Sequence, residues 1–235
     1  MKEALKKRII VFAPHPDDET LGCGGTIARR INEGYEVIVV VITDGRYSFS
    51  VVLGIDSDPT PEELKEIRKN ETIRATKILG VPKDNLLFLD FEDNTLATHE
   101  KEVEEKIINI MKQYTPEEVY FTYEKDYNYD HQATSRIVRR SVQRLGLPSI
   151  QYQYSIARPG TCGVYGRIRP LIDAVMNIFK KNYVKIDVTE FLSLKQKALS
   201  EFKSEISIIS NKQKKPITQD KDHFLKNNET FFLDR

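Results

Sequence analysis

The apolar residues of this 235-residue chain gather in short runs that alternate with helix-like stretches over its first two-thirds. These runs are rich in Val, Ile and Phe, which is typical of strands buried on both faces of a parallel sheet. They predict strands at residues 8–13, 36–43, 85–91 and 118–122, and more polar runs predict two further strands at 149–157 and 183–188.

The stretches between these strands have the apolar spacing of amphipathic helices. Thr60-Pro61-Glu62-Glu63 is a typical helix start, with a capping residue, a proline at the first position and acidic side chains in the first turn. Repeated strand–helix units predict a single α/β domain, with a mostly parallel sheet and helices on both faces. The spacing predicts helices at residues 24–33, 60–79, 100–114, 131–145, 171–181 and 190–208, and irregular loops at 46–59, 158–169 and 210–223.

Composition argues against several classes of protein. With 36 basic and 35 acidic side chains, the chain has no overall field that would attract nucleic acid or an anionic membrane. No segment reaches the roughly 20 apolar residues that span a bilayer. The two cysteines, Cys23 and Cys162, provide no disulfide framework, so we expect a cytoplasmic protein. We interpret Cys23 as a small core thiol rather than a nucleophile.

The most unusual polar cluster follows the first predicted strand, where the chain reads His15-Pro16-Asp17-Asp18-Glu19. Open parallel sheets bind ligands at the carboxyl ends of their strands, and charges packed there are costly unless a divalent cation neutralises them. Because His15 and Asp18 are three residues apart, they can share one ion across a helical turn. Asp17 points elsewhere and remains free beside that ion.

A catalytic zinc site takes three protein ligands and leaves one position open for water. The third ligand must come from farther along the chain, where the imidazoles are His99, His131 and His223. We favour His131, because it follows the strand predicted at 118–122 and therefore lies at the same edge of the sheet. We expect the other two histidines at the surface.

Two other functions fit part of this pattern. Gly22-Cys23-Gly24-Gly25 after a strand is compatible with a nucleotide-binding oxidoreductase. The charged cluster, however, occupies the turn where the first glycine of that fingerprint belongs, and its carboxylates would repel a pyrophosphate. The second alternative is a non-catalytic sugar- or metal-binding protein, which has no need of the free Asp17 carboxylate beside a metal.

Taken together, several motifs resemble those of the LmbE-like, or PIG-L-type, zinc-dependent N-deacetylases. They are the His15–Glu19 cluster, Gly24-Gly25-Thr26, Thr43-Asp44-Gly45, Arg68 with Glu71, and Asp130-His131. The resemblance covers about residues 8–140, reaches from Asp187-Val188-Thr189 through Lys197-Ala198, and extends to Glu229-Thr230-Phe231. It implies a Rossmann-like single domain over residues 1–235, with a core at about 8–150 and a segment, 151–235, that completes the pocket.

The resemblance also implies an activity, the removal of the acetyl group from an N-acetylglucosamine-type sugar or sugar conjugate. Carried over residue by residue, it makes His15, Asp18 and His131 the ligands of one zinc ion per chain. Asp17 becomes the general base that takes a proton from the attacking water. Arg68 becomes a substrate-binding residue, which contacts hydroxyl or carbonyl groups through its fixed fork of donors.

One departure from the family lies in the distal motif. The family usually has His-Pro-Asp-His where this chain has Asn128-Tyr129-Asp130-His131. The first histidine of that motif helps to polarise the substrate carbonyl and is oriented by the aspartate. Here Asn128 takes its place beside Asp130, and it can donate a hydrogen bond but carries no charge. We expect Tyr129, with Tyr127 and Tyr165, to form an aromatic wall for a sugar ring.

A second departure lies near the C-terminal part of the sequence, where the usual His-Arg-Ser-Gln becomes Phe202-Lys203-Ser204-Glu205. Both changes concern substrate identity more than metal binding. The substrate can therefore be an N-acetyl sugar, a sugar conjugate or an amide without a sugar. We further expect a homo-oligomer.

Overall fold

The computed structural model describes residues 6–156, 183–218 and 221–234. Seven strands form one sheet in the order β3-β2-β1-β4-β5-β7-β6, and all neighbours from β3 to β5 are parallel. The last strand in sequence, β7, enters antiparallel between β5 and β6. The strands are β1 Arg8–Ala13, β2 Glu36–Thr43, β3 Leu86–Phe91, β4 Glu118–Thr122, β5 Ile150–Tyr154, β6 Tyr183–Asp187 and β7 Asn228–Asp234.

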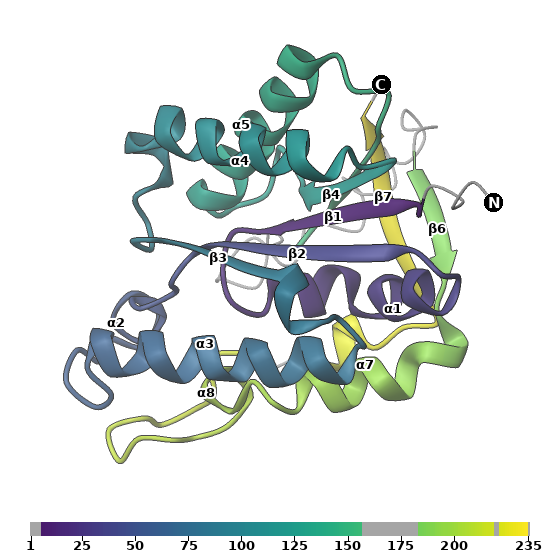
Figure 1. The fold of residues 1–235 in the computed structure, drawn as a ribbon. Helices are drawn as coiled ribbons and strands as arrows, with labels where there is room; N and C mark the ends of the chain where they lie inside the picture. The colour runs from purple at the N-terminus through teal and green to yellow at the C-terminus, as the bar shows by residue number, and fades with distance from the viewer. Residues whose placement is uncertain (1–5, 157–182, 219–220, 235) are drawn as a thin grey trace, which may run out of the picture.

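Helices cover both faces of the sheet (Figure 1), with α4 and α5 on one face and α1, α3 and α7 on the other. The predicted α/β fold with a mostly parallel sheet is therefore confirmed. The helices are α1 Asp18–Asn32, α2 Ser48–Leu53, α3 Pro61–Ile78, α4 Glu100–Tyr114, α5 Tyr129–Leu145, α7 Leu192–Leu199 and α8 Lys203–Ile206. Short 3-10 turns occupy Lys83–Asn85, Leu96–Thr98, Thr189–Phe191 and Lys221–Phe224. No helix in these described ranges is long and apolar enough to cross a membrane.

The continuous apolar runs have a simple origin in the two buried faces. Along β1, Ile9 and Val11 join the core beneath α1 and α7, while Ile10 and Phe12 join the core beneath α4 and α5. All four side chains are fully buried. A strand covered on both sides has no position for a polar side chain, so the run remains apolar from end to end.

The helix predicted at residues 24–33 begins six residues earlier, at Asp18, so the predicted start was wrong. The glycines of this region weaken a helical pattern, but here they allow close packing. A Cβ atom on Gly25 would lie 2.6 Å from Cβ of Val188, so only glycine lets the segment after β6 approach α1 this closely.

Three further elements differ from the sequence prediction. The loop predicted at 46–59 contains α2, and β7 was not predicted. The helix predicted at 190–208 is interrupted, because the chain turns at Phe202 to bury that ring and to bring the next residues against α3. The helix predicted at 171–181, the loop at 158–169, Cys162 and Tyr165 lie outside the described residues.

Candidate metal centre and catalytic site

The site is built where β1 and β4 end, from side chains that the following turns direct toward one another. Nδ1 of His15, Oδ2 of Asp18 and Nε2 of His131 lie 3.1 Å apart in all three pairs. Two ligand atoms of a tetrahedral zinc ion are separated by roughly 3.3 Å, given Zn–N and Zn–O bonds of about 2.0–2.1 Å. The three predicted ligands therefore meet as a triangle of the size that one such ion requires.

Carboxylates orient both imidazoles from behind. Nε2 of His15 faces Asp93 at 3.3 Å and Asp130 at 3.4 Å, and Nδ1 of His131 faces Asp126 at 3.2 Å. For the neutral imidazoles we assign the ring proton to this outward nitrogen, because the other nitrogen of each ring faces the triangle. That assignment leaves the lone pairs of the inward nitrogens free for a metal.

Asp130 also fixes the loop that carries Asp93. Its two carboxylate oxygens accept hydrogen bonds from the backbone N–H groups of Asn94, at 2.8 Å, and Leu96, at 3.2 Å. His15, Asp93 and Asp130 form a second group with metal-ligand distances. We interpret this group as the support of His15, because it shares that imidazole with the first triangle.

The charges of the triangle compensate one another. Burial lowers the pKa of His131, but Asp18 and Asp126 outweigh it and raise that pKa to about 9. Burial alone would raise the pKa of Asp18, whereas the two imidazoles hold it well below its usual range. Asp18 therefore stays ionised, and the carboxylates around the two imidazoles make them strongly basic. Such a set of donors is suited to a divalent metal.

Asp17 stands next to the triangle but does not belong to it. Its φ of 109° lies in a region that few non-glycine residues adopt, so the backbone is strained at this residue. Burial raises the pKa of the Asp17 carboxyl group well above its usual value, opposed by Arg68 and supported by Glu205. A carboxylate with a raised pKa is suited to accept a proton near neutral pH.

Glu19 supports this turn rather than adding a ligand. It is fully buried, and its carboxylate accepts hydrogen bonds from the backbone N–H of Asp17 and the hydroxyl of Thr20. Burial raises the pKa of Glu19 to about 7, although these hydrogen bonds oppose the shift.

Arg68 extends from α3 into the site and is itself buried. Its guanidinium donates to the carbonyl of Pro16 at 2.6 Å and to that of Gly45 at 3.1 Å. The same group lies 3.4 Å from Asp17 and 3.2 Å from Glu205. These contacts give Arg68 a role in holding the Asp17 turn, and its contact with substrate stays a prediction.

The residues of the altered distal motif have different surroundings. Oδ1 of Asn128 accepts hydrogen bonds from the N–H groups of Asp130 and His131 and so caps α5. Tyr129 is 80% exposed and Tyr127 is 61% exposed. Both rings are therefore available to a ligand, but the aromatic wall stays a prediction.

The sequence interpretation assigned no role to three residues of this site, namely Asp93, Asp126 and Glu205. Asp93 could have been found, because it follows β3 as the first cluster follows β1. Asp126 lies in the loop after β4 that precedes the Asn128–His131 motif, and its spacing from His131 did not indicate that it contacts that imidazole. Glu205 reaches the site only through the turn at Phe202, which no local pattern indicates. Of the remaining residues, His99 is exposed and Cys23 is fully buried, as expected.

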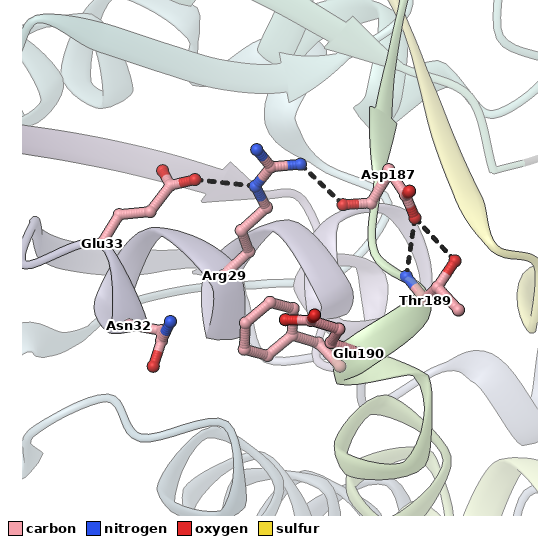
Figure 2. Close-up of a pocket in the computed structure, with 7 residues that line it drawn as sticks. Arg29, Asn32, Glu33, Asp187, Thr189 and Glu190 are labelled. Carbon is pink, nitrogen blue, oxygen red and sulfur yellow. Dashed lines mark hydrogen bonds and ion pairs between the residues drawn. The ribbon is translucent and has the colours of Figure 1, made fainter.

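A hollow of about 480 Å³ lies elsewhere, between the end of α1 and the residues after β6 (Figure 2). Arg29 donates there to Glu33 at 2.7 Å and to the carbonyl of Asp187 at 2.8 Å, and the Asp187 carboxylate accepts from Thr189. These polar groups satisfy one another. We therefore interpret the hollow as part of the contact between the last turn of α1 and the end of β6.

Comparison with known proteins places this site in context. The family described as PIG-L, GlcNAc-PI de-N-acetylase, matches residues 10–142, a range that includes His15, Asp18 and His131. Diacetylchitobiose deacetylase of Thermococcus kodakarensis is 28% identical over 206 residues, which cover 85% of this chain and 70% of that protein. A probable N-acetyl-alpha-D-glucosaminyl L-malate deacetylase 2 of Bacillus cereus is 32% identical over 143 residues, which cover 60% of this chain and 63% of that protein.

Solved structures show the same fold. The chain matches N,N'-diacetylchitobiose deacetylase from Pyrococcus horikoshii with a TM-score of 0.70 at 23% identity, over 97% of this chain and 84% of that one. The fold also carries other chemistry, since the hydratase GalB of Pseudomonas putida matches with a TM-score of 0.66 at 22% identity, over 83% of this chain and 78% of that one. The family match covers more than half of the sequence and contains the metal triangle, and the chain therefore belongs to the PIG-L family.

Proposed function

We propose that this protein is a zinc-dependent N-deacetylase, which hydrolyses the acetamide of an N-acetylglucosamine-type sugar or sugar conjugate. The observation that carries the proposal is the triangle of His15, Asp18 and His131, with the Asp17 carboxylate next to it in sequence, outside the triangle and paired with Arg68. Membership of the PIG-L family and relatives named as deacetylases of acetylated sugars support the same reaction.

The three ligand atoms would hold one metal ion. Two imidazoles and one carboxylate match the ligands of catalytic zinc sites, and three protein ligands leave a position open. When bound, such an ion lowers the pKa of water and polarises a carbonyl group. The two carboxylates behind His15, with Asp126 behind His131, would hold the outward ring nitrogens and so orient the inward nitrogens toward that ion.

Asp17 would perform the proton transfers. It takes a proton from the water that attacks the acetamide carbonyl and later gives it to the departing amine. Burial supports both steps, because a raised pKa makes Asp17 a stronger base and a competent acid within one cycle. Arg68 would hold the Asp17 turn through its hydrogen bond to the Pro16 carbonyl and its ion pair with the Asp17 carboxylate.

The substrate would approach past the start of α5. Tyr129 is exposed there, two residues before the ligand His131, and offers an apolar ring face of the kind on which a sugar can lie. Asn128 could donate a hydrogen bond from its amide nitrogen while its oxygen caps the helix. A cytoplasmic location and a homo-oligomer stay predictions.

The test is an acetate-release assay with metal content measured on the same preparation. N-acetylglucosamine, N,N'-diacetylchitobiose and an N-acetylglucosaminyl malate conjugate serve as sugar substrates, and an N-acetylated amino acid serves as a non-sugar amide. We expect about one zinc per chain and acetate from at least one sugar. Acetate released from the amino acid alone would show that the substrate is a simple amide and not a sugar. Zinc binding without any acetate release would contradict the deacetylase function.

Asp17→Asn separates metal binding from proton transfer. The amide has nearly the shape of the carboxylate but cannot accept the proton, so turnover should fall by roughly 10²–10⁴-fold while zinc content stays unchanged. Unchanged turnover would remove Asp17 from the role of general base.

A further inference from the structure

A buried ion pair meets the backbone of α1 one turn after the metal ligand Asp18. Glu229, from β7, accepts hydrogen bonds from the N–H groups of Gly25 at 2.9 Å and Thr26 at 2.8 Å. Lys195, from α7, donates to the carbonyl of Leu21 at 2.8 Å and to Glu229 at 2.6 Å. Lys195 is 1% exposed and Glu229 is 6% exposed.

These contacts fall on the hydrogen-bond ladder of the helix itself. In an α-helix the N–H of Gly25 pairs with the carbonyl of Leu21, four residues earlier. Here each of these two backbone groups contacts a charged side chain of the pair. The pair therefore meets the continuous helix α1 between the turn that carries Asp18 and the turns that follow Gly25.

Each charge faces backbone groups of opposite polarity. The Glu229 carboxylate accepts from the N–H groups of Gly25 and Thr26, and the Lys195 ammonium donates to the carbonyl of Leu21, so both are charge-assisted hydrogen bonds. Glycine at position 24 leaves room for the Lys195 side chain, because a Cβ there would lie 3.1 Å from Cγ of Lys195. Such a pair offsets its desolvation cost only when extra hydrogen bonds satisfy it, as they do here.

We infer that Lys195 and Glu229 are positioning residues for the metal site, an inference that rests on the proposed function. Leu21 lies about 4.5 Å along the helix axis from Asp18, at 1.5 Å per residue. Both Thr20 and Leu21 donate their N–H groups to the carbonyl of Asp17. The pair thus fixes the carbonyl end of the turn that carries the Asp18 ligand and the Asp17 base.

The chain offers a matched control. Glu118, at the start of β4, is also buried and pairs with Arg30, in the last turn of α1, at 2.9 Å. Neutralising it removes a similar ion pair from the same helix, but at the end remote from the metal site. Glu118→Gln and Glu229→Gln both neutralise a buried glutamate that pairs with a cation, but only Glu229 bonds the α1 backbone close to Asp18.

The experiment titrates chelator-treated protein with Zn²⁺ against a competing chelator, well below the unfolding temperature. We expect Glu229→Gln and Lys195→Met each to weaken zinc binding by roughly 10–100-fold. Because the two residues act as one unit, the double variant should lose no more than the weaker-binding single variant. Glu118→Gln should lower the melting temperature but keep zinc affinity within about twofold.

Two results would overturn the inference. One is wild-type zinc affinity in both Glu229→Gln and Lys195→Met, and the other is an equal loss in Glu118→Gln, which would reveal general destabilisation. Neither depends on the substrate, because the titration uses the metal alone. Wild-type protein that binds zinc and releases no acetate would contradict the proposed function and leave this inference standing.

Discussion

At the residue scale, Asn128 illustrates how one position can carry two roles. In the sequence motif, Asn128 replaces a histidine that polarises a carbonyl group. In the structure, its side-chain oxygen accepts hydrogen bonds from the first N–H groups of α5. That helix carries His131 in its first turn. Asn128 therefore supports the predicted metal ligand His131 through the backbone, whatever its amide nitrogen contributes to substrate binding.

The cap can be measured by mutation. Asn128→Ala leaves two backbone donors without their side-chain acceptor and should lower the free energy of unfolding by about 1 kcal/mol. Asn128→Ser keeps an acceptor of suitable length and should stay within a few tenths of a kcal/mol of wild type. Denaturant unfolding of both variants measures this difference. Equal stability of the alanine variant would show that α5 does not depend on this cap.

At the element scale, α4 and α5 are joined by two different kinds of interaction. Glu100 and Glu104 form ion pairs with Arg136, Arg140 and Arg144 on the outer side. On the inner side, Ile107 is fully buried in the core beneath these helices. The two sides make very different contributions to stability, because ion pairs with exposed arginines are weak and core packing is not.

This contrast predicts unequal costs of mutation. Ile107→Ala should lower the free energy of unfolding by about 2–5 kcal/mol, and Glu104→Gln by at most about 1 kcal/mol. Hydrogen bonds from Arg144 lower the pKa of Glu104 below its usual 4.5. Its contribution is therefore present above pH 4.5 and is lost as the pH falls below that value. Unfolding of both variants, near neutral pH and at acid pH, would reveal a different order if the ion pairs dominated.

The elements also show how far the sequence alone can be interpreted. Strands such as β1 and β2 were found because two buried faces leave an unmistakable apolar run. The start of α1 was missed because its glycines weaken the helical signal, and their value lies in contacts with Val188 and Lys195, distant in sequence. The ligand triangle could be inferred from strand ends and family motifs. Asp93 follows β3 in the same way but was given no role, whereas Glu205 was missed because it reaches the site through a turn that only tertiary packing defines.

At the scale of the whole molecule, the predicted metal site joins distant parts of the chain. The two imidazoles belong to segments more than 100 residues apart, so a metal ion that binds both should stabilise the entire fold. An ion present at about 100 times its dissociation constant adds about 2.7 kcal/mol. Removal of zinc by a chelator should therefore lower the melting temperature, and added zinc should restore it.

Protons compete with the metal for the same atoms. With a pKa of about 9, His131 is protonated near neutral pH in chelator-treated protein. The stability that this proton contributes is present in full below about pH 6.5 and is lost as the pH rises through about 9. Zinc must displace this proton, so apparent zinc affinity should rise with pH, by about tenfold per pH unit for each proton displaced. Chelator-competition titrations between about pH 6 and pH 8 measure the slope. A flat profile would show that no ligand proton is displaced.

The placement of β7 has a consequence for the order in which the molecule assembles. The hydrogen bond from Gly25 to Glu229 joins residues 204 positions apart, whereas α4 and α5 are near neighbours along the chain. Because contacts of long sequence separation form slowly, the helix pair can assemble early while α1 still awaits its partner strand. During synthesis, the turn with the predicted ligands His15 and Asp18 emerges well before β7, whose Glu229 secures it. A chain interrupted before β7 would have every predicted zinc ligand, but not the ion pair that holds the turn on which Asp18 lies.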